Sequence, residues 1–332
     1  MAQIASQTGP RVTIGMPVYN GEVFLREALD SVLAQTFADF ELIISDNCST
    51  DATQAICEAY RSRDGRIRYY REEVNRGAAW NYNRLVELAR GKYFKWAAHD
   101  DLLAPTFLER CVDGLESDPS AVLCFTDDQD VDIDGNPDDR FRRQSHVSAS
   151  WRGCSPVLAD RVRNLTRMDY DCEEVFGLIR LETLRRTRMI QSYTDSDRTL
   201  LVELGLYGHF RMIPERLFLH RHHPGSSVRA NPISGGWHER VGWFDPSLSD
   251  KVLFSEWRQL GEILQAIRRA PLTMAVRVKA VAWVAARYRR RIKGLTKELT
   301  RGLSRMLLRN PRPRQESVPG ESRARRELTK AP

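Results

Sequence analysis

The feature that most constrains the fold is a regular alternation of two hydrophobic patterns between residues 11 and 132. Short runs of apolar, β-branched and aromatic residues are typical of buried strands, and the segments between them carry apolar residues at helical spacing. The strand-like runs are 11–19, 40–47, 66–72, 92–98 and 121–132, and the helical segments are 22–36, 51–63, 78–90 and Pro105 to Leu115. Strands separated by helices are joined by crossovers, so the pattern predicts a mainly parallel α/β sheet flanked by helices.

Beyond residue 132 the periodicity is weaker. The next stretch, 133–175, is polar and loop-rich. The remaining segments are predicted as a strand and helix over 174–187, an amphipathic helix over 195–208, a pair of strands around Ile213 and Pro214 over 209–223, basic helices from about 251, and a disordered tail over 309–332.

Composition narrows the class of protein. The chain has 332 residues, of which 42% are hydrophobic and 29% charged, as expected for a soluble protein of one large or two smaller domains. No run of about 18 apolar residues is present, and the N-terminus lacks the pattern of a signal peptide. We therefore expect a cytoplasmic protein. The six cysteines form no C-x-x-C pair, which argues for reduced thiols and against structural zinc.

Four predicted strands end in polar clusters, at Tyr19–Asn20, Ser45–Asn47, His99–Asp101 and Asp127–Asp128. Ligands of parallel sheets bind at the carboxyl ends of the strands, so we expect these clusters to converge on one edge. Asp and Asn also make turns after strands, and any single cluster is compatible with that structural role. The adjacent carboxylates of Asp100 and Asp101 repel each other, and a divalent cation such as Mn²⁺ or Mg²⁺ is an obvious remedy.

Three blocks of sequence, in order, resemble glycosyltransferase family 2, whose members are inverting nucleotide-sugar transferases with the GT-A fold. The first block, 12–53, contains P-x-Y-N, S-x-x-x-Q and D-N-x-S-x-D. The second, 75–101, begins with N-x-G and ends in the D-D metal motif. The third, 194–227, has an Asp that opens a helix and then R-x-H-x-x-S. The resemblance covers about 12–228 and implies a GT-A fold.

The resemblance implies a nucleotide pocket at the ends of the first two strands. Asp46 matches the position that bonds the imide of the nucleobase, which favours uracil or thymine. Pro17 and Tyr19 would line the same pocket, with Tyr19 as a wall for the base. Asn20 and Asn47 belong to the same motifs and are predicted to bind the nucleotide.

The resemblance also implies roles around the diphosphate. Asp101 would contact the metal, and Asp100 would lie near the ribose. Arg221 and His223 would approach the diphosphate, and His223 could also bind the metal. The metal would stabilise the charge that develops on the leaving diphosphate. His220 and His222 make this stretch His-rich, but without acids or cysteines at zinc-ligand spacing.

Asp197 matches the family's catalytic base, and one carboxylate suffices for a single inverting displacement. The family's usual Glu-Asp pair is replaced here by Ser196-Asp197. This departure leaves open whether Asp195 or Asp197 is the base. Asp195 or Ser196 could alternatively cap the helix. Trp237 and Trp243 could stack on an acceptor sugar, although tryptophans more often pack in cores.

The C-terminal region is strongly basic. Residues 258–314 contain 16 Lys and Arg residues against 2 acidic residues. The segment 272–309 is too charged to span a bilayer, but it could lie on an anionic membrane surface at the inner face of the plasma membrane. A plain solvated extension and a nucleic-acid patch are the alternatives, and no nucleic-acid motif supports the latter.

We therefore expect a GT-A domain over 1–230, with a nucleotide half at about 11–132 and an acceptor half at about 133–230. A helical basic extension over 231–308 and the tail 309–332 would follow. The expected function is transfer of a sugar from a nucleotide donor to a glycan or lipid-linked glycan, in cell-surface polysaccharide or glycolipid synthesis. A nucleotidyltransferase would carry a Gly-rich phosphate loop where this chain has PVYNGE, 17–22. A non-catalytic carbohydrate- or membrane-binding scaffold is the other alternative.

Overall fold

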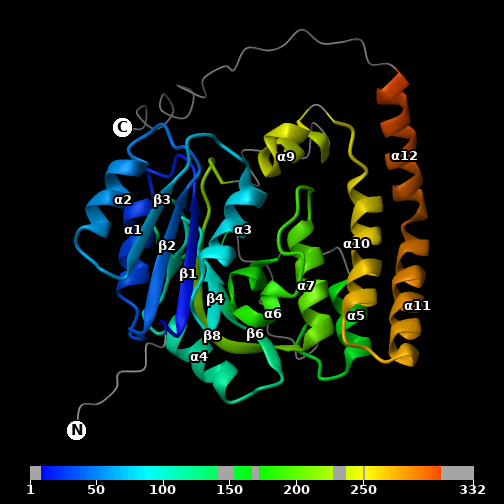
Figure 1. Cartoon of the computed structure of the whole chain (residues 1–332), viewed down its shortest axis with the longest axis horizontal. Coiled ribbons are helices and arrows are strands. Elements are labelled where there is room, and N and C mark those ends of the chain that lie inside the picture. Colours follow the sequence, from blue (N-terminus) through cyan, green and yellow to red (C-terminus); the bar gives the residue numbers. More distant parts are fainter. Residues whose placement is uncertain are drawn as a thin grey trace.

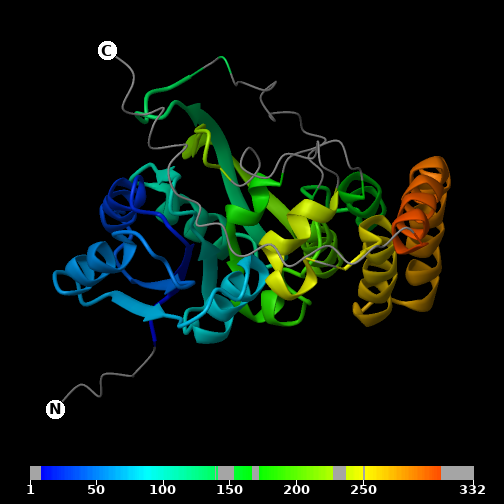
Figure 2. The same ribbon diagram turned by 90° about the horizontal axis from the view of Figure 1, so that it is seen from above.

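The computed structural model describes residues 9–138, 140, 153–166, 172–226, 237–249 and 251–307. Its centre is one eight-stranded sheet with the strand order β3-β2-β1-β4-β7-β6-β8-β5. Helices cover both faces of this sheet, as Figure 1 shows from the front and Figure 2 from above.

The first half confirms the alternation read from the sequence. Its parallel strands are β1 (Val12–Val18), β2 (Phe40–Asp46), β3 (Ile67–Arg71) and β4 (Tyr93–Trp96). Its helices are α1 (Leu25–Leu33), α2 (Thr53–Arg61), α3 (Ala78–Leu88) and α4 (Phe107–Glu116). All residues of β1 and β2 are buried, as expected for strands covered on both faces.

The second half departs from a simple parallel continuation. The short strand β7 (Leu178–Arg180) lies between β4 and β6 (Ala121–Val131) and is antiparallel to both. The edge strand β5 (Leu102–Leu103) pairs antiparallel with β8 (His209–Arg221). The strand and helix predicted over 174–187 are confirmed as β7 and α6 (Leu181–Arg185). The sequence did not predict the two-residue strand β5 or the place of β7 in the sheet, because so short a strand has no recognisable periodicity and strand order is not a local property.

The predicted pair of strands over 209–223 is wrong, because β8 is one strand of 13 residues. Its parallel pairing with β6 passes from Ile213 directly to Arg216, so Pro214 and Glu215 are accommodated as an irregularity. Proline cannot donate to the ladder, and a bulge lets the strand continue past it.

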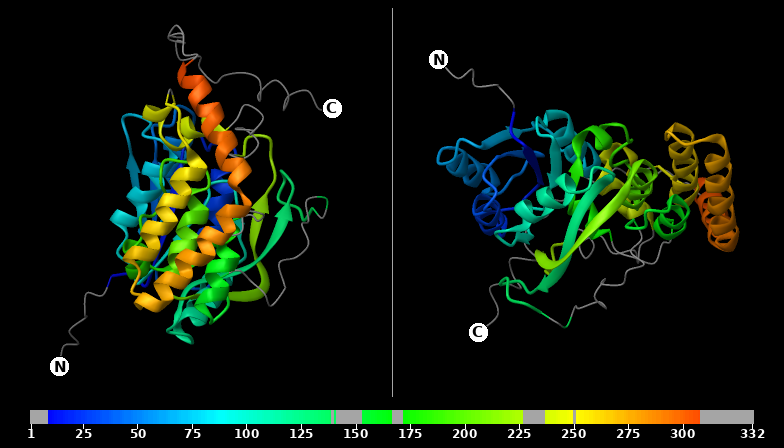
Figure 3. Two further views of the ribbon diagram at one scale, coloured as in Figure 1. Left: turned by 90° about the vertical axis from the view of Figure 1, so that its right-hand side faces the viewer. Right: turned by 90° about the horizontal axis from the view of Figure 1, so that it is seen from below.

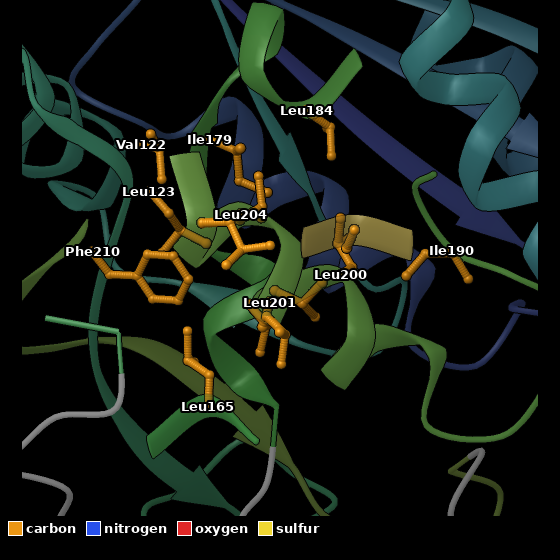
Figure 4. Close-up of a cluster of buried hydrophobic side chains, with 14 of the residues drawn as sticks. Val122, Leu123, Leu165, Ile179, Leu184, Ile190, Leu200, Leu201, Leu204 and Phe210 are labelled. Atoms are coloured by element: carbon orange, nitrogen blue, oxygen red, sulfur yellow. The ribbon is translucent and has the colours of Figure 1, made fainter. Parts of the chain in front are cut away.

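A large hydrophobic cluster lies between the sheet and the helices of the second half. Figure 4 shows Leu200, Leu201 and Leu204 of α7 (Ser196–Tyr207) in one cluster with Leu165 and Phe210. Leu165 ends α5 (Leu158–Leu165), a helix within the segment predicted to be loop-rich. The other elements here are η2 (Glu173–Phe176) and α6 (Leu181–Arg185).

The region predicted to carry basic helices from about 251 is mainly helical where the structure describes it, and two short helices precede it. In chain order these helices are α9 (Trp237–Phe244), η4 (Pro246–Leu248), α10 (Ser255–Arg269), α11 (Met274–Arg290) and α12 (Ile292–Leu307). α10 packs against α7, and α11 and α12 form an outer layer, which Figure 3 shows in its left view. None of the helices within 9–307 that the structure describes is long and apolar enough to cross a membrane. The predicted tail 309–332 lies outside the described residues, and the domain boundaries stay predictions.

Candidate active site

The polar ends of β1, β2 and β4 meet at one edge of the sheet. The backbone N–H of Asn20 donates to Ser49 Oγ at 2.9 Å, and Asn20 Oδ1 accepts from the N–H of Thr50 at 2.9 Å. Asn20 has a positive φ of 52°, a conformation that asparagine tolerates well. A Cβ added at Gly21 would lie 2.7 Å from the ring of His99, so the turn after β4 rests on the end of β1.

The residues that are predicted to bind the nucleotide differ in how far their side chains are exposed. Asp46 is fully buried, and it accepts from the N–H of Ser49 at 2.8 Å and from the hydroxyl of Tyr69 at 2.7 Å. Tyr19 is 46% exposed, whereas Pro17 is buried. Part of the Tyr19 side chain is therefore accessible to a ligand.

The side chain of Asn47 is committed to the turn before α3. Its amide donates to Asn75 Oδ1 at 2.8 Å, and its Oδ1 accepts from the N–H of Arg76 at 2.9 Å. The position of this turn thus depends on Asn47. Its predicted contact with the nucleotide stays a prediction.

Asp100 and Asp101 follow β4, with Asp100 half-buried and Asp101 buried. Asp101 Oδ1 accepts from the backbone N–H of Arg221 at 2.9 Å, and Asp100 Oδ2 lies 2.9 Å from Nε2 of His223. Burial raises the pKa of Asp101 to about 6. Burial would also raise the pKa of Asp100, but the charge of His99 and the hydrogen bond from His223 outweigh it and lower that pKa to about 2.

This donor set fits a hard divalent cation. Among the described residues, no Arg or Lys forms an ion pair with Asp101, which is only 9% exposed. A cation would supply the missing positive charge, with water and substrate phosphate as its other ligands. The described part of the chain contains no preformed group of three or more His, Cys, Asp or Glu ligands.

Arg221 lies beneath the Asp100–Asp101 turn, with its guanidinium fully buried. It donates to the carbonyl oxygen of Asp100 at 2.9 Å, to Glu27 Oε2 at 2.6 Å and to the carbonyl oxygen of Ile133. The guanidinium also lies 4.8 Å from the ring centroid of Phe24. To contact a diphosphate, as predicted, Arg221 would have to leave these partners. The sequence did not indicate that Glu27 and Phe24 contact Arg221. Acidic and aromatic residues are common near the start of a helix, so neither residue stood out.

Asp197 stands at the start of α7, one residue after the buried Ser196. Its Oδ1 accepts from the N–H of Arg198 at 2.8 Å. Burial, and then the charge of Asp195, raise the pKa of Asp197 to about 6. Asp195 itself has a positive φ of 64° and an Oδ1 that lies 3.4 Å from Nε of Arg198.

Tyr82 of α3 is influenced both by the Asp100–Asp101 pair and by Asp197. Burial raises its pKa, and so do the charges of Asp100, Asp101 and Asp197. The charges of all three carboxylates therefore act on the phenol of Tyr82, although about 100 residues separate the first two from the third. Nothing in the sequence marked Tyr82 as part of the site.

α9 packs against the start of α3, close to the site. Gly77, which precedes α3, has a φ of 85°, and a Cβ there would lie 2.3 Å from the carbonyl oxygen of Phe244. Trp243 is 39% exposed, whereas the side chain of Trp237 lies outside the described residues. Their predicted stacking on an acceptor sugar stays a prediction.

Known structures identify the fold. The S. aureus TarS fragment 1–349 in complex with UDP-GlcNAc superposes with a TM-score of 0.59 at 16% sequence identity, covering 83% of this chain and 71% of that one. A second crystal structure of S. aureus TarS 1–349 superposes with a TM-score of 0.57. The architecture is the GT-A fold of nucleotide-sugar transferases, a mostly parallel sheet with flanking helices.

The sequence identifies the family. The family model described as glycosyl transferase family 2 matches residues 13–193, and the chain belongs to this family of glycosyltransferases. The putative teichuronic acid biosynthesis glycosyltransferase TuaG of Bacillus subtilis is 34% identical over 159 residues, 46% of this chain and 63% of TuaG. The chondroitin synthase of Escherichia coli is 33% identical over 127 residues, 38% of this chain and 18% of that enzyme. The chain thus spans less than two thirds of these relatives. The family assignment decides against a nucleotidyltransferase.

Proposed function

We propose that this protein transfers a sugar from a UDP- or dTDP-sugar to a hydroxyl of a glycan or lipid-linked glycan, with inversion at the anomeric carbon. The observation that carries the proposal is the Asp100–Asp101 pair that follows β4, where Asp101 accepts from the N–H of Arg221 at 2.9 Å and Asp100 lies 2.9 Å from Nε2 of His223. The charge of the candidate base Asp197 acts on the same tyrosine, Tyr82, as the charges of this pair. A donor site and a base are both needed for transfer, and they must face the same substrate. The names of TuaG and chondroitin synthase favour a role in cell-surface polysaccharide or glycolipid synthesis.

Donor binding would use the edge of the sheet. Asp46 would accept from the base imide, Tyr19 would stack on the base, and Asp100 would lie near the ribose. Asp101, with His223 as a further candidate, would hold Mn²⁺ or Mg²⁺, which neutralises charge on a diphosphate when it is bound. His223 Nε2 already faces Asp100, so Nδ1 is the ring nitrogen left for a phosphate or metal.

Asp197 would act as the general base. It would take the proton of the acceptor hydroxyl as the acceptor oxygen bonds to the anomeric carbon. In the same displacement the bond from that carbon to the diphosphate oxygen breaks, and the nucleoside diphosphate leaves with the bonding electron pair. A base is most effective when its pKa lies near the working pH, and a pKa of about 6 suits this role better than that of an ordinary aspartate.

The test separates donor binding from transfer. Purified protein is heated with UDP, dTDP, GDP, CDP or ADP, each with Mn²⁺ or with EDTA, and matching nucleotide sugars are then assayed for nucleotide release. We expect one pyrimidine nucleotide to raise the melting temperature only with Mn²⁺. A ligand at about 100 times its Kd adds about 2.7 kcal/mol to the free energy of unfolding.

Two variants make the outcome specific. Asp101→Asn should lose the Mn²⁺-dependent shift, whereas Asp197→Asn should keep the shift and lose nucleotide release. If no nucleotide shifts the melting temperature, the donor proposal is wrong. If a nucleotide binds but no sugar is released or transferred to any glycan, the result favours the alternative of a non-catalytic carbohydrate- or membrane-binding scaffold.

A further inference from the structure

The outer faces of α11 and α12 combine exposed apolar side chains with unpaired positive charge. On α11, Met274, Val278 and Val281 are 69%, 61% and 39% exposed. On α12, Ile292 and Leu303 are 50% and 48% exposed. The buried face of α11 is a different one, made by Ala280, Val284 and Tyr288. The exposed apolar residues are therefore left over after the core has formed.

Charge around these residues is almost all of one sign. Residues 271–307 contain ten Lys and Arg residues and one acid, Glu298. Glu298 accepts from the N–H groups of Glu256 and Trp257 at the start of α10. Its charge therefore faces α10 and does not lie on the outer face. Among the described side chains of α11 and α12, the exposed cations without an ion pair are Lys279, Arg289, Arg290, Lys293, Lys297 and Arg301.

We infer that the outer face of α11 and α12 docks on the surface of an anionic phospholipid bilayer. A helix that lies in the interface buries its apolar side chains at the headgroup boundary while cations contact lipid phosphates. A purely solvated extension does not need Met274 and Val278 to be exposed side by side at one-turn spacing. A nucleic-acid surface would not use the apolar residues at all.

The placement of the helices makes this docking useful. α12 ends at the same end of the molecule as the parallel strands β1 and β2, where the candidate site lies (Figure 1). Docking would bring the site close to acceptors embedded in the membrane. This consequence rests on the proposed function, whereas lipid binding itself does not and is measured without any sugar donor.

The experiment is flotation of the full chain with vesicles of phosphatidylcholine, with and without phosphatidylglycerol. We expect binding only to the anionic vesicles, and weaker binding at high salt. Arg289→Glu with Arg290→Glu should lower the partition coefficient at least tenfold, since each surface cation contributes about 1 kcal/mol. Val278→Gln with Val281→Gln, which keeps all charges, should also lower it severalfold.

The matched control reverses two exposed arginines on the opposite side of the molecule, Arg61→Glu with Arg63→Glu, at the same change in net charge. It should bind the vesicles like the wild type. Equal binding by the α11 variants and the wild type would overturn the proposal, as would equal binding to neutral vesicles. Tighter binding to duplex DNA than to anionic vesicles, or a dimer in sedimentation that the valine variant dissociates, would also overturn it. Circular dichroism of every variant excludes unfolding.

Discussion

The backbone N–H of Arg221 lies 2.9 Å from Oδ1 of Asp101, and the Arg221 guanidinium donates to the carbonyl oxygen of Asp100. Arg221, the last residue of β8, thus donates hydrogen bonds to both residues of the candidate metal motif. The same guanidinium reaches Glu27 on α1, so three segments far apart in the sequence share one buried cation.

Arg221→Met should destabilise the ligand-free protein by about 3 kcal/mol or more, because it leaves buried carbonyl oxygens without donors. Glu27→Gln is the matched control: Glu27 is 54% exposed, and glutamine keeps a hydrogen-bond acceptor for the guanidinium, so this variant should cost less than Arg221→Met. Urea unfolding without nucleotide measures both. If Arg221→Met unfolds like the wild type but loses nucleotide affinity, Arg221 binds the diphosphate and the positioning role is wrong.

Asp101→Asn should abolish Mn²⁺-dependent nucleotide binding while the variant remains folded, because one of the two adjacent carboxylates loses its charge. Isothermal titration of nucleotide with Mn²⁺, and then with EDTA, measures the effect. Asp113→Asn on the exposed face of α4 is the control and should bind like the wild type. Undiminished binding by Asp101→Asn would place the metal elsewhere.

Transfer should rise with pH through about 6, because Asp197 must be deprotonated to accept a proton and its pKa is about 6. Asp197→Asn should lower kcat by about 100-fold or more, and Asp195→Asn much less. Initial rates between pH 5 and 8 give the profile. A larger loss in Asp195→Asn than in Asp197→Asn would assign the base to Asp195 instead.

The carboxylate of Asp197 should also lower the free energy of unfolding when it is ionised. In the unfolded chain an aspartate ionises near pH 4, whereas folded Asp197 retains its proton up to about pH 6. The free energy of unfolding therefore falls as pH rises through this window. Asp197→Asn should gain about 2 kcal/mol relative to the wild type at pH 8, and nothing near pH 3.5. Urea unfolding at both values checks this, and an equal difference at both would contradict it.

Gly77→Ala should destabilise the protein by about 2 kcal/mol or more, because its φ of 85° is unfavourable for alanine and the new Cβ would meet the Phe244 carbonyl at 2.3 Å. Gly65→Ala is the control, since a Cβ there meets nothing within 4 Å. Thermal unfolding compares the two. Equal melting temperatures of the two variants would mean that the close approach of the Phe244 carbonyl oxygen to Gly77 does not contribute to stability.

Local sequence determined the first half of this protein. The strands β1 to β4 and the helices between them follow from hydrophobic periodicity, which depends on near neighbours along the chain. The Asp100–Asp101 motif and the Asp197 position were likewise readable, because family motifs are short and contiguous. The basic character of the last helices is also a property of composition alone.

Only the tertiary structure decided how these parts meet. The insertion of β7 between β4 and β6, the burial of Arg221 and the influence of three carboxylates on Tyr82 all depend on how residues far apart in the chain are brought together. Which face of α11 stays exposed depends on where α10 and α5 pack. Such contacts are set by packing and by the satisfaction of buried polar groups, and no local pattern encodes them.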